Sequence, residues 1–244
     1  MRMDVPAIIK QYFGRLYSNL LPTPCLLCGD LSQQDYLCPS CHADLPLLKQ
    51  ACPHCAMPSP NGLLCGQCLQ QTPERDASFS LYRYQYPVDR FITNFKFHHQ
   101  LYLGDFLAQQ LALKLQEQQR PLPDLLIPIP LHPKRLKQRG YNQALEITRY
   151  LAKSLHLPYE KHALKRVKNT APQTSLPYSQ RQKNLQQAFQ VCKKDLPQHI
   201  VLIDDVLTTG HTADMAAKSL RKVGVKTIEL WTIARAIRHD SSYG

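Results

Sequence analysis

Apolar residues after about residue 80 recur in two patterns, which are short continuous runs and longer stretches with apolar positions three or four apart. Short runs are typical of strands, and the longer spacing is typical of helices. We therefore predict strands at residues 80–84, 125–129, 200–203 and 227–234 and helices at residues 101–116, 141–155 and 212–223. Because strands alternate with helices, the pattern predicts an α/β domain built on a parallel sheet.

The first 78 residues follow a different pattern. Residues 1–22 place apolar side chains near one face of a helix but are interrupted by charges, which predicts an amphipathic helix and not a signal peptide. Residues 69–78 are mainly polar and predict a linker. The predicted domains are an N-terminal helix at residues 1–22, a cysteine-rich domain at 23–71 and the α/β domain at 75–238.

Eight of the nine cysteines form Cys-x-x-Cys pairs that repeat with a period of 27 residues. Two such turns supply the four thiolates of a tetrahedral, closed and therefore structural zinc site. We predict a double zinc ribbon with one or two Zn²⁺ ions, each held by one set of four. Interleaved sharing of the sets and a disulfide framework are the alternatives, and the lack of a secretory signal disfavours disulfides. The sets are Cys25, Cys28, Cys38 and Cys41, then Cys52, Cys55, Cys65 and Cys68.

Residues 201–212, VLIDDVLTTGHT, are difficult to explain by folding alone, because an apolar strand runs into two adjacent acids. Asp204 and Asp205 stand at the carboxyl end of a predicted strand, where ligands bind in open α/β sheets. The next residues lead into a helix whose first amides favour an anion, while carboxylates accept hydrogen bonds from sugar hydroxyls. The stretch therefore predicts a site for a ribose 5-phosphate group. Its loop comprises Val206, Leu207, Thr208, Thr209, Gly210, His211 and Thr212.

The same stretch resembles the phosphoribosyl pyrophosphate (PRPP) motif of type I phosphoribosyltransferases, Asp-Asp, two residues and then Thr-Thr-Gly-x-Thr. Residues 91–100, 127–144, 169–185 and 232–236 are similar to the ComF family of competence proteins, and the resemblance extends from about residue 25 to 236. It implies a type I phosphoribosyltransferase-like parallel sheet flanked by helices and preceded by a small double zinc ribbon. The related GntX proteins, which carry a gluconate-utilisation name, are not separable from ComF by sequence.

The resemblance also implies roles for single residues. Asp204 and Asp205 would bind the ribose and serve in catalysis, and Lys96 would lie on a pyrophosphate-contacting loop. Arg139 would act from a segment that resembles a mobile lid, where it would stabilise the departing pyrophosphate. Mg²⁺ would accompany PRPP and bridge pyrophosphate and hydroxyls. The acceptor stays open. The other lid residues are Arg135, Gly140, Tyr141 and Asn142.

The charge adds a second partner to this picture. The net charge of +12 and the pI near 9.3 suit a polyanion. Residues 134–168 contain ten lysines or arginines against two glutamates, which is more than one pyrophosphate needs. This basic stretch is either a solvated loop or a track for a nucleic-acid backbone, with Tyr141 or Tyr178 as stacking faces.

Three hypotheses follow. The chain is a ComF-like protein of natural transformation that handles incoming single-stranded DNA in the cytoplasm and carries a PRPP-binding domain. Alternatively, it is an active phosphoribosyltransferase of nucleotide or related metabolism without a DNA role. In the third, it is a zinc-scaffolded adaptor for other competence proteins.

Overall fold

The structure is a computed structural model that describes residues 23–32, 36–167, 188–193 and 195–237. The chain divides into two compact units, residues 1–45 and 46–244, which are described separately here. The predicted ribbon domain, residues 23–71, is thus shared between the two units. The predicted helix at residues 1–22, the family-like stretch at 169–185 and Tyr178 lie outside the described residues.

The first unit contains the first cysteine set. Strand β1 (Thr23–Pro24) pairs antiparallel with β2 (Leu31–Ser32), and the short helix α2 (Pro39–Ala43) begins after Cys38.

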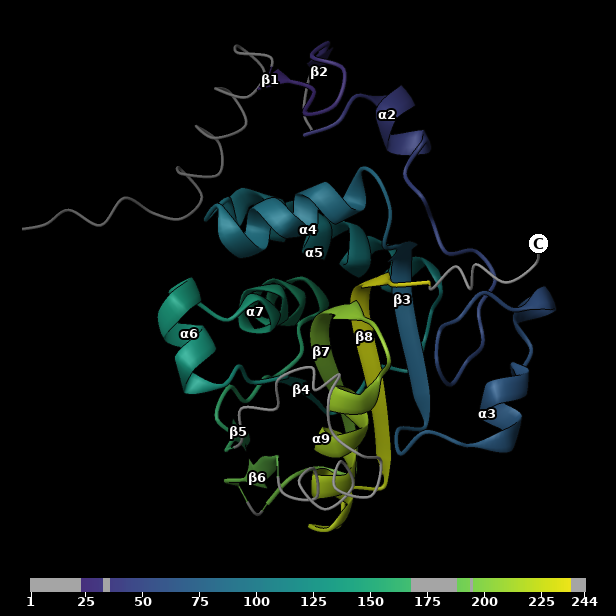
Figure 1. Cartoon of the computed structure of the whole chain (residues 1–244), viewed down its shortest axis with the longest axis vertical. Helices are drawn as coiled ribbons and strands as arrows, with labels where there is room; N and C mark the ends of the chain where they lie inside the picture. Colours follow the sequence, from purple (N-terminus) through teal and green to yellow (C-terminus); the bar gives the residue numbers. More distant parts are fainter. Residues whose placement is uncertain (1–22, 33–35, 168–187, 194, 238–244) are drawn as a thin grey trace, which may run out of the picture. The chain divides into compact units, whose positions relative to one another are not determined.

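The second unit is built on a four-stranded parallel sheet with the order β3-β8-β7-β4. Because all four strands run in the same direction, their carboxyl ends meet at one edge of the sheet (Figure 1). This arrangement confirms the predicted α/β class. The strands are β3 (Ala77–Arg83), β4 (Leu125–Pro128), β7 (His199–Leu207) and β8 (Thr227–Arg235).

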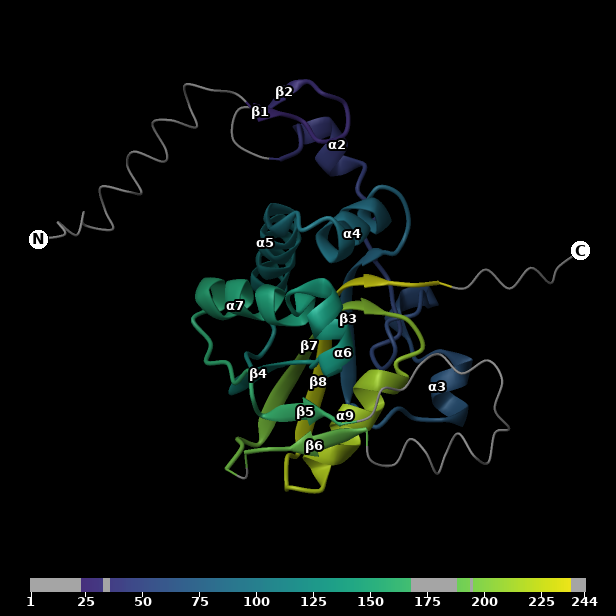
Figure 2. The same ribbon diagram turned by 60° about the vertical axis from the view of Figure 1, so that its left-hand side comes forward.

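Helices cover both faces of this sheet. Helices α5 and α7 pack on each other and on the sheet, and α4 packs on α5 (Figures 1 and 2). On the other face, α9 packs beside the hairpin of β5 and β6. The helices on the first face are α4 (Val88–Phe97), α5 (Leu101–Glu117) and α7 (Gln143–Leu155), and the elements on the second are α9 (His211–Arg221), β5 (Leu164–Arg166) and β6 (Phe189–Val191).

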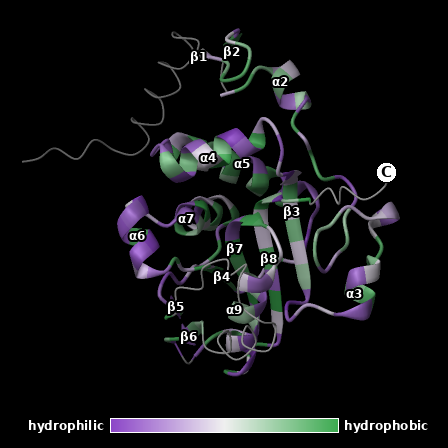
Figure 3. Cartoon of the chain, viewed as in Figure 1, coloured by the Kyte–Doolittle hydropathy of each residue, from purple (hydrophilic) through white to green (hydrophobic). Residues whose placement is uncertain are grey.

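Three shorter elements complete the unit. The helix α6 (Pro133–Arg139) precedes α7 and is mainly hydrophilic, in contrast to the hydrophobic strand β7 (Figure 3). The 3₁₀ turn η1 (Pro60–Gly62) and helix α3 (Gly66–Gln70) belong to the second cysteine set. Across the described part of the chain, no helix has the length and apolar character that a membrane crossing requires.

Several elements differ from the sequence prediction, including α6, the hairpin of β5 and β6, and β3, which begins inside the predicted linker; two more differences concern the candidate site. Strand β7 runs to Leu207, because its pairing with β8 continues past Asp204, so both acids lie within the strand. The segment expected to hold Lys96 on a loop is instead the helix α4, which buries Val88, Phe91, Ile92 and Phe95 along one face.

Candidate ligand site and zinc centres

Strand geometry separates the two adjacent acids. Successive side chains of a strand point to opposite faces of the sheet. Ile200 and Leu202 belong to the core shared with α9, so Asp204 lies on the α9 face of β7. Asp205 then lies on the face covered by α5 and α7. The two carboxylates therefore flank the end of the strand and do not crowd one another on a single face.

Asp205 is neutralised by a lysine from another element. Its Oδ1 lies 2.9 Å from Nζ of Lys96, which stands in the last turn of α4. The Asp205 side chain is 10% exposed and the Lys96 side chain 17%. The structure therefore joins two of the predicted site residues in a largely buried ion pair.

Asp204 has a different electrostatic environment. Burial, and next the negative charge of Asp205, raise the pKa of Asp204 to about 7. The backbone N–H of Asp205 donates to Oδ1 of Asp204 at 2.9 Å. Near neutral pH the two acids together carry less than two negative charges, which explains how the fold tolerates adjacent aspartates.

The loop after β7 has the form of an anion cradle. Gly210 has a φ of 80° and caps the start of α9, and the N–H of His211 donates to Oγ1 of Thr209 at 3.4 Å. A cavity of about 50 Å³ is lined by Asp204 together with Thr208, Gly210 and Thr212. The start of α9 adds the positive end of its dipole. The geometry thus places the Asp204 carboxyl beside the start of a helix whose dipole favours an anion.

Two buried arginines donate hydrogen bonds to backbone carbonyls of this loop, and the sequence pattern did not indicate either of them. Arg75 is 2% exposed, and its Nη1 donates to the carboxylate of Asp214 and to the Gly210 carbonyl at 3.5 Å. Arg235 is 7% exposed, and its Nη1 donates to the carbonyls of Leu207, at 2.9 Å, and of Thr208. The predicted linker at residues 69–78 gave no sign that Arg75 is part of the core.

The predicted lid is a helix tied to α4. Nη1 of Arg139 donates to Oε1 of Gln143 at 3.0 Å, and its guanidinium lies 5.1 Å from the ring centroid of Phe97. The hydroxyl of Tyr141 donates to the Phe95 carbonyl. The predicted catalytic residue Arg139 thus contacts Gln143 and Phe97 in this structure and is not paired with Asp204 or Asp205. Of the predicted basic site residues, Lys96 is the one that pairs with Asp205.

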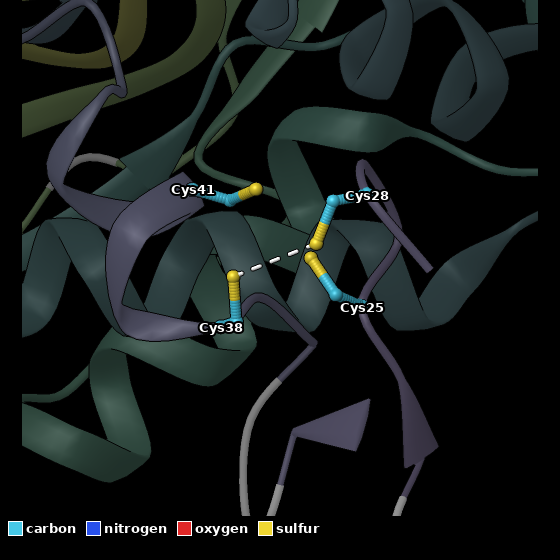
Figure 4. A group of neighbouring side chains, drawn as sticks. All are labelled: Cys25, Cys28, Cys38 and Cys41. Atoms are coloured by element: carbon cyan, nitrogen blue, oxygen red, sulfur yellow. Dashed lines mark hydrogen bonds between the residues drawn. The ribbon is translucent and has the colours of Figure 1, made fainter. Parts of the chain in front are cut away.

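The two cysteine sets form two separate four-sulfur clusters, grouped sequentially as the first prediction had it. The sulfurs of each cluster lie within 4.8 Å of one another (Figure 4 shows the first cluster). Cys28 and Cys38 sulfurs are 3.6 Å apart, and those of Cys55 and Cys65 are 3.5 Å apart. A tetrahedral Zn²⁺ with bonds of about 2.3 Å spaces its sulfurs about 3.8 Å apart. Both clusters therefore suit structural zinc.

Backbone amides lower the pKa of one thiol in each cluster and so favour the thiolate form. Burial opposes ionisation of Cys25 and Cys52, but backbone N–H groups of the turns outweigh it. They lower the pKa of Cys25 to about 6 and the pKa of Cys52 to about 7. Thiolates are the form that binds Zn²⁺.

The basic stretch is divided by the fold. Lys134 and Lys137 are exposed on α6, whereas Arg166 is buried with its guanidinium 5.6 Å from the Phe189 ring centroid. Arg149 pairs with Glu146 at 2.8 Å. Among the described residues of this stretch, exposed lysines lie on α6, at Lys134 and Lys137, and also at Lys153, Lys161 and Lys165.

Comparison with known proteins agrees with these features. A family model described as a double zinc ribbon domain matches residues 16–69. The chain is 38% identical over 179 residues to competence protein F of Haemophilus influenzae, covering 70% of this chain and 78% of that protein. It is 31% identical over 206 residues to DNA utilization protein YhgH of Escherichia coli O157:H7, covering 82% and 91%.

A solved structure, a purine phosphoribosyltransferase from Pyrococcus horikoshii Ot3, matches 54% of this chain and 82% of that chain with 19% identity and a TM-score of 0.33. That likeness is too low to bear on function.

Fold and site together define an α/β protein that carries two four-cysteine clusters suited to structural zinc and a strand whose two adjacent aspartates precede the start of a helix. The relatives place it more narrowly. The chain belongs to the competence protein F (ComF) family.

Proposed function

We propose that this protein acts in natural transformation, in the cytoplasm, on incoming single-stranded DNA, and that its second unit binds PRPP with Mg²⁺. The observation that carries the ligand part is the placement of Asp204 and Asp205 on β7, immediately before the anion cradle that opens α9. The observation that supports the DNA part is the naming of its relatives as competence and DNA utilization proteins.

In this proposal each part of the site receives one part of the ligand. The ribose hydroxyls donate to the two carboxylates, and the 5-phosphate is bound by residues 208–212 at the start of α9. Lys96 leaves Asp205 and turns to the pyrophosphate, because the carboxylate gains new partners on ligand binding. Mg²⁺ would be held at the acids and would supply charge neutralisation for the pyrophosphate.

A second candidate function is a working phosphoribosyltransferase without a DNA role. The cradle and acids favour it, because they supply positioning for displacement at the anomeric carbon. Release of pyrophosphate from PRPP in the presence of candidate bases, lost in Asp205→Ala, would support this function. A third candidate is an adaptor that binds other competence proteins through its zinc ribbons. It predicts that ligand and DNA assays fail while a pulldown recovers a partner.

The ligand part is tested by calorimetric titration of the purified protein with PRPP and Mg²⁺. We expect binding that weakens by about tenfold or more in Asp204→Asn and in Asp205→Asn, because each replaces a carboxyl oxygen that accepts from a ribose hydroxyl by an amide nitrogen that cannot accept. The matched control is Asp195→Asn, which changes an aspartate at an exposed position between β6 and β7. Absence of wild-type binding at millimolar PRPP would refute this part.

The DNA part is tested by titrating single-stranded DNA at several salt concentrations. Replacing Lys134 and Lys137 by alanine should weaken binding and reduce the slope of log K against log salt by about 1.4, the value for two lost phosphate contacts on a single strand. The control replaces Lys222 and Lys226, which are also exposed but follow α9. Asp205→Ala should leave DNA binding unchanged. An unaltered salt slope in the α6 variant would exclude α6 as the contact.

A further inference from the structure

Two chains of hydrogen bonds connect the second cysteine cluster, Cys52 to Cys68, to residues 208–212, the loop proposed to bind the phosphate and called the phosphate loop below. The first chain runs through Arg235, the last residue of β8. Its Nε donates to the Cys55 carbonyl at 2.8 Å, and its Nη1 donates to the carbonyls of Leu207 and Thr208. One planar side chain therefore fixes the distance between a metal-binding turn and the backbone that opens the loop.

The second chain runs through Arg75 and ends on the same turn. Nε of Arg75 donates to Oγ of Ser78 at 2.6 Å, and Ser78 Oγ donates to the His54 carbonyl at 2.7 Å. On the other side, Arg75 Nη1 reaches the Gly210 carbonyl and Asp214 in the first turn of α9. Residues 54 and 55 both lie in the Cys52–Cys55 turn, so both chains start from a single Cys-x-x-Cys pair.

The packing around Gly210 shows how closely the loop is seated on Arg75. A Cβ placed on Gly210 would lie 2.8 Å from both terminal nitrogens of the Arg75 guanidinium. The two arginines also line a cleft of about 760 Å³ between the second ribbon and α9. The ribbon and the loop thus lie on opposite sides of this cleft and are bridged by the arginines.

We propose that the second zinc ribbon positions the phosphate loop, with Arg235 and Arg75 as the positioning residues. The Cys52–Cys55 turn would be fixed by the Zn²⁺ that the second cluster suits, the turn carbonyls hold the two guanidinium groups, and these hold residues 207–210 in the shape proposed to receive a phosphate. The zinc thus supports the ligand site from a distance and touches no ligand. The ligand half of this inference rests on the proposed function, whereas the loop half does not.

The loop half is tested by hydrogen–deuterium exchange of the full chain. Cys65→Ser removes a ligand of the second cluster, and Cys38→Ser removes the ligand at the equivalent place of the first, 27 residues earlier. We expect the amides of residues 208–212 to exchange about tenfold faster in Cys65→Ser, through easier local opening, and to be unchanged in Cys38→Ser. Zinc content, measured in parallel, should fall by one ion in each variant. Equal exchange in the two variants would overturn the proposal.

The arginine link is tested without disturbing either metal site. Arg235→Lys keeps the charge but cannot bridge Cys55 and Thr208 with one ammonium group. We expect it to retain both zinc ions and to bind ribose 5-phosphate about tenfold more weakly. The matched control is Arg221→Lys, since Arg221 also donates to carbonyls, those of Glu74 and Lys226, but at the far end of α9.

Two readouts separate this inference from unfolding and from the proposed function. The fluorescence of Trp231, the single tryptophan and fully buried in β8, reports whether the sheet is intact in every variant. If wild type fails to bind ribose 5-phosphate while loop exchange still responds to Cys65→Ser, the proposed function fails and the positioning role stands. If wild type binds and Arg235→Lys binds equally well with unchanged loop exchange, the positioning role fails alone.

Discussion

Lys96 and Asp205 form an ion pair across two elements, with Nζ of the lysine 2.9 Å from Oδ1 of the aspartate. The lysine comes from a helix on one face of the sheet, and the aspartate from the end of the strand that leads into residues 208–212. In the ligand-free protein, Lys96 is paired with the carboxylate of Asp205, which would accept a hydrogen bond from the ribose of the proposed ligand. Ligand binding would therefore exchange one set of partners for another and would not fill a vacant acid.

Breaking this pair should destabilise the ligand-free protein. Lys96→Gln leaves a largely buried carboxylate without its cation, so we expect the free energy of unfolding to fall by about 1–3 kcal/mol. Chemical denaturation measures this. The control is Lys114→Gln, which breaks the exposed pair with Glu117 and should cost at most about 0.5 kcal/mol. Adding Asp205→Asn to Lys96→Gln should restore part of the loss, and equal effects of the two lysine variants would contradict the prediction.

The raised pKa of Asp204 predicts a pH-dependent stability. Its carboxyl stays protonated in the folded protein up to about pH 7 but ionises at about 3.9 in the unfolded chain. The folded state therefore holds the extra proton, and wild-type stability falls as pH rises through 7. Asp204→Asn lacks this dependence.

We expect the stability difference between Asp204→Asn and wild type to shift in favour of the variant by about 1 kcal/mol between pH 6 and pH 8.5. Denaturation at the two pH values measures the shift. A difference that stays constant across this range would show that Asp204 ionises at its ordinary value.

Gly210 and Gly224 provide a matched pair for testing how tightly the loop is seated. Both have positive φ, 80° and 96°, so alanine strains the backbone at either place by about 1 kcal/mol. Only at Gly210 does the added Cβ meet Arg75, whereas nothing lies within 4 Å at Gly224. We expect Gly210→Ala to lose about 1–3 kcal/mol more stability than Gly224→Ala. Similar losses, measured by thermal unfolding, would mean that Arg75 moves aside freely.

The two cysteine clusters predict a metal content of two Zn²⁺ per chain. Elemental analysis of the purified protein measures it, and Cys41→Ser or Cys68→Ser should each reduce it by one ion. Cys192→Ser is the control, since that cysteine lies outside both clusters and should leave the content at two. The double variant Cys25→Ser/Cys41→Ser should also lose one ion, because both ligands belong to the first cluster, whereas the loss of two ions would indicate interleaved sharing.

The sheet could be predicted because its residues follow simple rules. Buried parallel strands are short apolar runs, and the run at residues 200–203 is one of them. Strand β7 extends past this run because its last residues pair with β8 although they are polar, and pairing between distant segments is not visible in local sequence. Helix α4 has apolar residues at helical spacing, at Val88, Phe91, Ile92 and Phe95. It was nevertheless not predicted, because the family resemblance implied a loop around Lys96.

The candidate site could be predicted only where local sequence carries it. Asp204, Asp205 and the loop are contiguous, so one stretch indicates them together. Arg75 and Arg235 lie 160 positions apart along the chain, and only the folded sheet brings both to the loop. The Lys96–Asp205 pair likewise required the fold. Sequence thus indicated the groups that would touch a ligand but not the groups that hold them in place.

We expect the two copies of the 27-residue repeat to differ in how freely they can accept substitutions. The bonds that hold the loop are all made within residues 46–244, so they depend on the second copy and its carbonyls at residues 54 and 55. If the second copy positions the loop as proposed, substitutions in that copy are constrained by the loop as well as by the metal. The first copy is constrained by its own metal site and by any partner that it binds. Among homologous chains it is therefore the copy that we expect to diverge, be exchanged or be lost.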